Sequence, residues 1–310
     1  MKVLLLGGHG FVGRNVAAAL AATAHEVVVA PGRDRCDLTD LDAARSCIRA
    51  AGPDVVVNCA ALVGSLNYVT ERAAEVLDAN LRMLLNIYRS VAEIVPGAVI
   101  AHPIANCAFP GDLEIYREDS LWQGAIHRSV LSYGSTRRMM PVMADCYAMQ
   151  YGLKTLAFFT PNMYGPHDST DPNKAHALNA LCARMVKARA EQAPFIEVWG
   201  TGTPVREWLY APDFARVLCE ALDRLADPGL AAPLNIAQQH GLTVRELVEL
   251  VAAETGYAGQ IRWDRNRPDG APRKVMDSEL FRKSFPDFRF TDFQGGVRST
   301  IDYYRSVLPY

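Results

Sequence analysis

Short apolar runs alternate with longer amphipathic stretches through the first half of the chain. Strands that are buried on both faces read as continuous runs of Val, Ile and Leu, whereas amphipathic helices show an apolar residue every three or four positions. Alternation of the two implies parallel βαβ units and predicts an α/β fold with a doubly wound parallel sheet of the Rossmann type. Strands are expected near 3–6, 26–30, 54–58, 98–101 and 155–159, and helices near 11–22, 41–51, 70–95 and 133–151.

The rhythm changes after Pro161. A stretch rich in Gly, Pro, Asp and Asn, residues 164–173, predicts a loop. Glu246 lies three residues after Thr243, as in a capping box that opens a helix. We therefore expect a smaller C-terminal α/β domain, with helices near 175–191, after Pro212 and after Thr243, and strands near 196–199 and 206–210.

The pattern divides the 310 residues into a cofactor-binding domain, 1–163, and a substrate-binding domain, 164–310, with part of 205–225 returning to the first. The chain is 50% hydrophobic, an apolar content that excludes intrinsic disorder. It carries 32 basic against 34 acidic side chains, and this lack of a basic excess argues against a dedicated nucleic-acid binder. No apolar run reaches the roughly 18 residues that a membrane span needs. Seven single cysteines without zinc-type spacing favour a reducing cytoplasm and no metal site.

A glycine-rich turn, Gly7-Gly8-His9-Gly10-Phe11-Val12-Gly13, follows the first strand and precedes the first helix. Glycine is needed where the chain turns sharply and where backbone N–H groups approach a pyrophosphate at a helix N-terminus. The second strand ends without the acidic residue that binds a free ribose 2′-hydroxyl, and Arg33 follows it, which favours NADP while leaving NAD open. The predicted dinucleotide site includes Gly7, Gly10, Phe11, Val12 and Gly13.

A second chemical signal is Tyr133 at the start of a predicted helix, with Arg137 one turn later. Residues four apart share a helix face, so the guanidinium is expected beside the phenol. A cation about 5 Å away, at an effective dielectric of ~20, contributes roughly 3 kcal/mol, or about two pKa units. The expected effect is a lowered tyrosine pKa, which helps the phenol to act as a general acid toward a carbonyl. Taken alone, such a pair is more often surface packing.

Three further motifs extend over most of the rest of the chain: Asn162-Met163-Tyr164-Gly165-Pro166-His167-Asp168, Val198-Trp199-Gly200-Thr201-Gly202-Thr203-Pro204-Val205-Arg206-Glu207, and Pro268-Asp269-Gly270-Ala271-Pro272-Arg273-Lys274. With the glycine turn, they make the sequence similar to the extended short-chain dehydrogenase/reductases, and most closely to the GDP-L-fucose synthases, which epimerise and reduce GDP-4-keto-6-deoxymannose. The resemblance implies a homodimer, NADP(H), and a nucleotide-diphosphate sugar bound between the domains.

The resemblance also implies roles by position. Tyr133 matches the family's catalytic tyrosine, and Cys107 and His176 match the pair that exchanges protons beside the ketone. Without the resemblance, Cys107 reads as a small core residue and His176 as a surface histidine. The implied cofactor contacts add Ala60, Arg137 and Asn162, and the nucleotide and diphosphate are expected at Arg184, Trp199, Arg206 and Lys274.

Two positions depart from the family pattern. The family's lysine, four residues after the tyrosine, is Arg137, which keeps the charge but has a bulkier planar head. The family's serine near the substrate carbonyl aligns with Ala105, and losing one hydrogen bond to a developing oxyanion typically costs on the order of 10²–10³ in rate. Asn106 is the candidate replacement among the catalytic residues.

These observations favour an NADP-dependent epimerase/reductase of a nucleotide-diphospho-4-keto sugar. An epimerase without net reduction, or a nucleotide-sugar dehydrogenase of a polysaccharide or natural-product pathway, stays open because of the two departures. A degenerate fold that binds cofactor and a partner protein without turnover is the third hypothesis.

Overall fold

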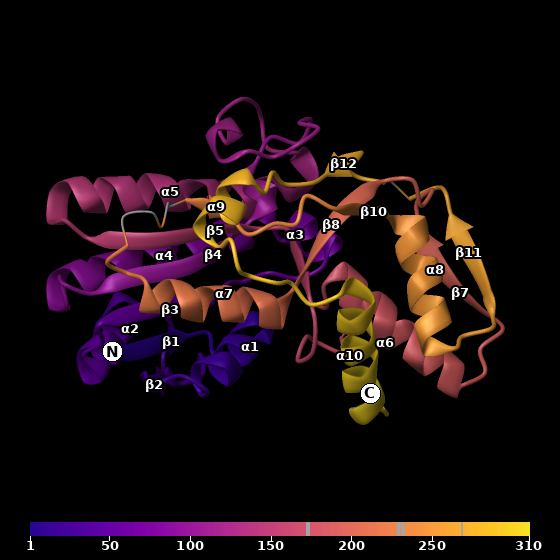
Figure 1. The fold of residues 1–310 in the computed structure, drawn as a ribbon, viewed down its shortest axis with the longest axis horizontal. Helices are drawn as coiled ribbons and strands as arrows, with labels where there is room; N and C mark the ends of the chain where they lie inside the picture. The colour runs from indigo at the N-terminus through magenta and orange to yellow at the C-terminus, as the bar shows by residue number, and fades with distance from the viewer. Residues whose placement is uncertain (172–173, 228–229, 231–232, 268) are drawn as a thin grey trace.

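Six parallel strands form the central sheet of the computed structural model (Figure 1). The strand order is β2-β1-β3-β4-β5-β9, so the order reverses between β1 and β3, where a doubly wound sheet opens a crevice at its carboxyl edge. The structure describes residues 1–171, 174–227, 230, 233–267 and 269–310. The strands are β1 (Lys2–Leu6), β2 (Glu26–Val29), β3 (Val55–Asn58), β4 (Val99–Ala105), β5 (Lys154–Thr160) and β9 (Leu234–Asn235).

Helices cover both faces of this sheet. One face packs against α1 (Phe11–Leu20) and α7 (Ala211–Asp223), and the other against α2 (Leu41–Ala51), α4 (Ala73–Ile94) and α5 (Leu131–Tyr151). Alternate residues of β1 enter the two cores, which is why the strand reads as one continuous apolar run. The predicted doubly wound parallel sheet is confirmed.

Two predicted elements differ from the structure. The single helix expected over 70–95 is wrong, because α3 (Leu66–Glu71) ends at Arg72, whose φ of −108° and ψ of 35° are not helical, before α4 begins. No Gly or Pro marks the break, so the helical periodicity continues across it. The strand expected at 98–101 continues to Ala105 and runs into a single 3₁₀ turn, η1 (Asn106–Ala108).

The C-terminal part of the chain builds a second core to the right of the main sheet in Figure 1. Thr243 caps α8 (Val244–Thr255) as predicted: its hydroxyl accepts from the Glu246 N–H at 3.1 Å, and the Glu246 carboxylate accepts from the Thr243 N–H at 2.7 Å. One small sheet contains β6 (Asn162–Tyr164), β8 (Val205–Tyr210), β10 (Gly241–Thr243) and β12 (Arg273–Lys274), and a separate parallel pair contains β7 (Phe195–Trp199) and β11 (Gln260–Asp264). The remaining helices are α6 (Ala177–Ala190), α9 (Glu279–Ser284) and α10 (Phe293–Ser306). Two 3₁₀ turns, η2 (Glu118–Ser120) and η3 (Arg128–Val130), precede α5.

The chain crosses between the two parts more than once. After β8 it returns to the main sheet, where α7 packs against α1 and β9 pairs with β5. The division of the chain into two domains at residue 163 stays a prediction. Pro268 of the third predicted motif and residues 172–173 of the predicted loop lie outside the described residues. Within the described part of the chain, no helix is long and apolar enough to span a membrane.

Candidate active site

The glycine-rich turn lies at the carboxyl end of β1 and is packed too closely for side chains. A Cβ on Gly7, whose φ is +72°, would lie 2.6 Å from the backbone nitrogen of Ala60, and a Cβ on Gly13 would collide with the Gly7 carbonyl. The Gly10 N–H donates to the Gly7 carbonyl at 3.0 Å, and α1 then begins at Phe11 without a side-chain cap. The first-turn amides are therefore left for a ligand, and a pyrophosphate is the group that such a cradle fits.

Arg33 lies in the loop after β2. Its Nε is 3.1 Å from a carboxylate oxygen of Asp37, while the Arg33 side chain stays 71% exposed. The other Asp37 oxygen accepts from the Thr39 N–H and hydroxyl at 2.9 and 2.7 Å, so the carboxylate is fixed by its own loop. The guanidinium keeps donors that face solvent, as a 2′-phosphate ligand requires. A cavity of about 300 Å³ lies beside it, lined by Arg33, Thr39, Leu62, Glu75, Asp78, Ala79 and Arg82.

Tyr133 and Arg137 lie together in the first two turns of α5, with the guanidinium carbon 4.7 Å from the centroid of the phenol ring. The predicted proximity is therefore present. The predicted lowering of the tyrosine pKa is wrong in its net direction: burial raises the pKa of Tyr133, and the Arg137 charge offsets only part of that rise. The phenol consequently keeps its proton at neutral pH.

Asn80 of α4, a residue outside the predicted site, holds Arg137 in place. The buried Arg137 donates from Nη2 to Asn80 Oδ1 at 2.9 Å. The same oxygen accepts from the Leu62 N–H at 3.1 Å, and Nδ2 donates to the carbonyls of Leu62 and Val76 at 2.8 and 2.7 Å. Asn80 therefore ties the loop after β3, which passes Gly7, to the cation beside Tyr133. A polar residue at a buried helix position was the available signal.

Cys107 and Asn106 lie in η1, directly beyond the carboxyl end of β4. A Cβ on Gly134 would lie 2.5 Å from the Cys107 carbonyl, so α5 can approach this turn because Gly134 follows Tyr133. Burial raises the pKa of the Cys107 thiol, and the charges of Lys274 and Arg137 oppose that rise. The side-chain nitrogen of Asn106 is enclosed and has no hydrogen-bond partner among the described residues.

His176 precedes α6 and is oriented by Asp168. The buried Asp168 carboxylate accepts from the His176 N–H at 2.8 Å and lies 3.1 Å from the imidazole Nδ1. The His176 ring also packs on Phe11, the first residue of α1, with the ring centroids 5.2 Å apart. Because Asp168 occupies Nδ1, the imidazole Nε2 is the nitrogen left for a ligand.

Arg206 and Lys274 form a cationic pair on adjacent strands, because they are register partners between β8 and β12. Arg206 donates to the carbonyls of Val205 and Asp269 at 2.9 and 3.2 Å, and neither Arg206 nor Lys274 has an ion-pair partner among the described residues. Burial, together with Arg206, lowers the pKa of Lys274. Two unneutralised cations that are partly withdrawn from water are suited to a diphosphate.

The other predicted substrate and cofactor residues lie nearby. Arg184 of α6 donates to the Glu197 carbonyl of β7. Trp199 ends β7, is 49% exposed, and has the guanidinium of Arg267 4.7 Å from its ring centroid. Asn162 begins β6 and is the register partner of Trp208 in β8. The structure therefore links Cys107, Tyr133, Arg137, Arg206 and Lys274 electrostatically, whereas Cys107 and His176 come from different elements and share no hydrogen bond.

A glycine turn at the switch point of a parallel sheet, with a tyrosine and a cation on a neighbouring helix, defines a dinucleotide-binding fold of the extended short-chain dehydrogenase/reductase class. The chain belongs to the NAD dependent epimerase/dehydratase family, whose model matches residues 3–237. The resemblance recognised in the sequence is thereby confirmed.

Individual relatives agree over nearly the full length. The chain is 30% identical over 283 residues to "Probable GDP-L-fucose synthase 1" of Oryza sativa subsp. japonica, covering 91% of this chain and 85% of that one. It is 29% identical over 307 residues to a GDP-L-fucose synthase of Azorhizobium caulinodans, covering 98% and 96%. Two solved structures share the fold: a GDP-L-fucose synthetase from Naegleria fowleri (TM-score 0.86, 22% identity, covering 98% and 93%) and a GDP-6-OMe-4-keto-L-xylo-heptose reductase from C. jejuni (0.88, 19%, 98% and 97%).

Proposed function

We propose that this chain is an NADP-dependent epimerase/reductase of a GDP-linked 4-keto sugar. The observation that carries the proposal is the cationic pair Arg206 and Lys274, neither of which has an ion-pair partner among the described residues. Lys274 lies within electrostatic reach of the Cys107 thiol, and Cys107 lies within reach of Tyr133 and Arg137. An anion site therefore adjoins groups that can exchange protons beside a ketone. The names of the relatives support a GDP-linked substrate.

The cofactor is expected over the glycine-rich turn. The uncapped start of α1 would hold the pyrophosphate, and the free donors of Arg33 would hold a 2′-phosphate. Asn80 would hold the loop at Leu62 and the Arg137 side chain in fixed positions beside the cofactor. A nicotinamide cofactor held there would supply the hydride that reduction of the ketone needs.

Epimerisation would use Cys107 and His176 from two walls of the site. The Cys107 thiolate takes the proton from a carbon beside the ketone, and the electron pair moves into the carbonyl to form an enolate. Lys274 and Arg137 favour the thiolate against burial. His176, held through Nδ1 by Asp168, returns a proton from Nε2 to the opposite face, which inverts that carbon.

Tyr133 would act as the acid toward the ketone oxygen. Its raised pKa keeps the phenol protonated until the carbonyl oxygen gains negative charge. Arg137, 4.7 Å from the ring centroid, then stabilises the phenolate that remains. Asn106, with a free and enclosed amide nitrogen, supplies a donor near the position where the family carries a serine.

The experiment supplies the purified chain with GDP-4-keto-6-deoxymannose and NADPH in deuterated water. Oxidation of NADPH together with deuterium in the sugar is expected. Deuterium uptake without oxidation would replace the proposal by an epimerase without net reduction, the second candidate favoured by Ala105 and Arg137. In that case Ala105→Ser with Arg137→Lys should create reduction. Neither signal would reject this substrate for the protein.

We also propose a homodimer through α4 and α5, which lie next to each other on one face of the sheet (Figure 1). Their outer surfaces carry large exposed apolar side chains, which soluble monomers rarely gather on adjacent helices. These are Leu77 and Leu85 of α4 and Met139 and Met149 of α5. A mass of two chains in light scattering, reduced to one by Leu85→Glu, is the expected result.

A further inference from the structure

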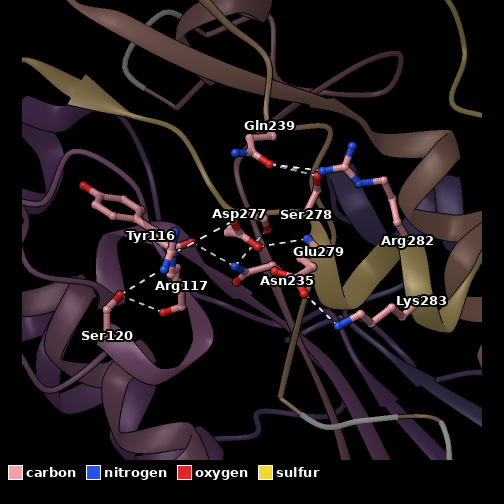
Figure 2. A network of polar contacts seen from close by, with 10 residues as sticks. All are labelled: Tyr116, Arg117, Ser120, Asn235, Gln239, Asp277, Ser278, Glu279, Arg282 and Lys283. Carbon is pink, nitrogen blue, oxygen red and sulfur yellow. Dashed lines mark hydrogen bonds and ion pairs between the residues drawn. The ribbon is translucent and has the colours of Figure 1, made fainter.

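Tyr116 is held by its backbone against the segment that follows Lys274. Its N–H donates to the Val275 carbonyl at 2.9 Å, and its carbonyl accepts from the Asp277 N–H at 2.8 Å. The same carbonyl accepts from Asn235 Nδ2 at 2.9 Å. Figure 2 shows the contacts with Asp277 and Asn235, with the phenol ring extending away from the rest of the polar network. The backbone of Tyr116 therefore has a fixed position relative to the strand that carries Lys274.

The ring of Tyr116 is fixed from its other side by Phe109. The two rings stack, with centroids 5.0 Å apart and planes within 9°, and Phe109 in turn packs on Phe159 of β5 at 4.8 Å. Phe109 is two residues beyond Cys107 in the chain. The phenol consequently lies between the Cys107 turn and the strand that carries Lys274.

The hydroxyl of Tyr116 has no protein partner. Five tyrosines are buried, and the hydroxyls of the other four contact His102, the Phe293 carbonyl, the Ala193 carbonyl and the Ser169 carbonyl. Among the described residues, none forms a hydrogen bond with the hydroxyl of Tyr116, which is 1% exposed. A tyrosine hydroxyl at the end of a buried ring usually finds a hydrogen-bond partner, so one without a protein partner is available to a ligand.

The charged groups near this hydroxyl define what could satisfy it. Burial raises the pKa of Tyr116 to about 12, Arg206 opposes the rise, and Cys107 and Asp112 add to it. The phenol is therefore protonated, and both the proposed diphosphate arginine and the proposed proton-abstracting thiol lie within electrostatic reach of it. In a nucleotide-diphosphate sugar, the sugar ring lies between the diphosphate and the reacting carbon.

We propose that the Tyr116 hydroxyl binds an oxygen of the sugar ring or of its hydroxyl groups, and so selects the sugar rather than the nucleotide. This inference rests on the proposed function, because it takes Arg206 and Cys107 as the two ends of the sugar site. It is independent of turnover, since a ground-state contact to the sugar is present before any bond changes.

The test compares Tyr116→Phe with the unaltered chain by calorimetric titration of GDP and of GDP-mannose. The variant removes one oxygen and keeps the ring stacked on Phe109, so its thermal midpoint should be maintained. We expect GDP-mannose to bind about 3- to 10-fold more weakly and GDP to bind equally. Tyr257→Phe is the matched control, because it also removes a tyrosine hydroxyl, but one that already donates to the Ala193 carbonyl. This variant should alter neither affinity.

Equal GDP-mannose affinity in Tyr116→Phe and the unaltered chain would overturn the inference. An equal loss for GDP and GDP-mannose would also overturn it, because the hydroxyl would then contact the diphosphate. Failure of the unaltered chain to bind GDP would instead contradict the proposed nucleotide, and UDP with UDP-glucose would then serve as the probe pair for Tyr116.

Discussion

The Asp168 carboxylate binds His176 twice, through the backbone N–H at 2.8 Å and through the imidazole Nδ1 at 3.1 Å. A buried carboxylate in this position fixes the orientation of the imidazole ring and leaves Nε2 for a ligand. Asp168 is thus a positioning residue for the proposed acid.

Asp168→Asn should slow proton exchange without affecting reduction. The amide keeps the size of the side chain but weakens the acceptor that holds the His176 backbone and imidazole, so the ring is less well oriented and deuterium uptake beside the ketone should fall about 10-fold or more. Reduction of a sugar already epimerised should continue at its original rate. Equal slowing of both steps would show that Asp168 serves the fold of the 164–176 segment and not His176.

Arg137→Met should suppress reduction. A cation 4.7 Å from the phenol ring centroid is worth roughly 3 kcal/mol at an effective dielectric of ~20, which corresponds to about 100-fold in rate. Stopped-flow oxidation of saturating NADPH measures the effect. Arg137→Lys is the matched control because it retains the charge, and it should recover most of the loss. A fully active Arg137→Met variant would remove the guanidinium from the mechanism.

Arg33→Ala should weaken NADPH binding about 10-fold and leave NADH binding unchanged, because only NADPH carries the 2′-phosphate. Fluorescence titration of each nucleotide gives both constants. Arg35→Ala is the control: Arg35 lies in the same loop, is 75% exposed, and is 3.9 Å from Asp34. If Arg35→Ala weakened NADPH binding as much as Arg33→Ala does, the effect would be general charge attraction.

The free energy of unfolding should fall as the pH rises, because the buried carboxyl of Glu207 loses its proton. Burial raises the pKa of this 1% exposed carboxyl from 4.5 to about 7, although backbone N–H groups of Met276, Gln238 and Gln239 donate to it. The folded state therefore holds a proton that the unfolded state releases between pH 4.5 and 7, and stability falls across this window by up to about 3 kcal/mol.

Urea unfolding at pH 5, 6, 7 and 8 measures the Glu207 contribution. Glu207→Gln cannot titrate and should flatten this part of the pH dependence. It should also be less stable at pH 5, because its amide nitrogen cannot accept a backbone N–H. An unchanged slope in the variant would show that other groups produce the pH dependence.

The fold and the cofactor turn could be predicted because their signals are local. A strand, a glycine cluster and a helix follow one another within residues 2–20, and their geometry is set by that stretch. The helix α10 was not predicted, because Gly295 and Gly296 interrupt its first turn. The strands β9, β10 and β12 have two or three residues each, too few to show a period.

The site could be predicted only where the residues in contact lie close together in the sequence. Tyr133 and Arg137 are one turn apart, so their proximity followed from helix geometry. The sign of the tyrosine pKa did not follow, because the burial that decides it comes from the tertiary packing around the first turn of α5. Asn80 meets Arg137 across 57 residues, and no periodicity connects two such positions.

The pairing of β8 with β12, and of Tyr116 with residues 275–277, bears on how the protein is made. A nascent chain that already carries the glycine turn, Cys107 and Tyr133 still lacks Lys274 and the backbone that holds Tyr116. The main sheet is complete once β9 has been synthesised, whereas Lys274 follows later in the chain. Translation that stops between β9 and β12 is expected to leave a nucleotide-binding fragment without turnover, one that competes for cofactor and releases no product.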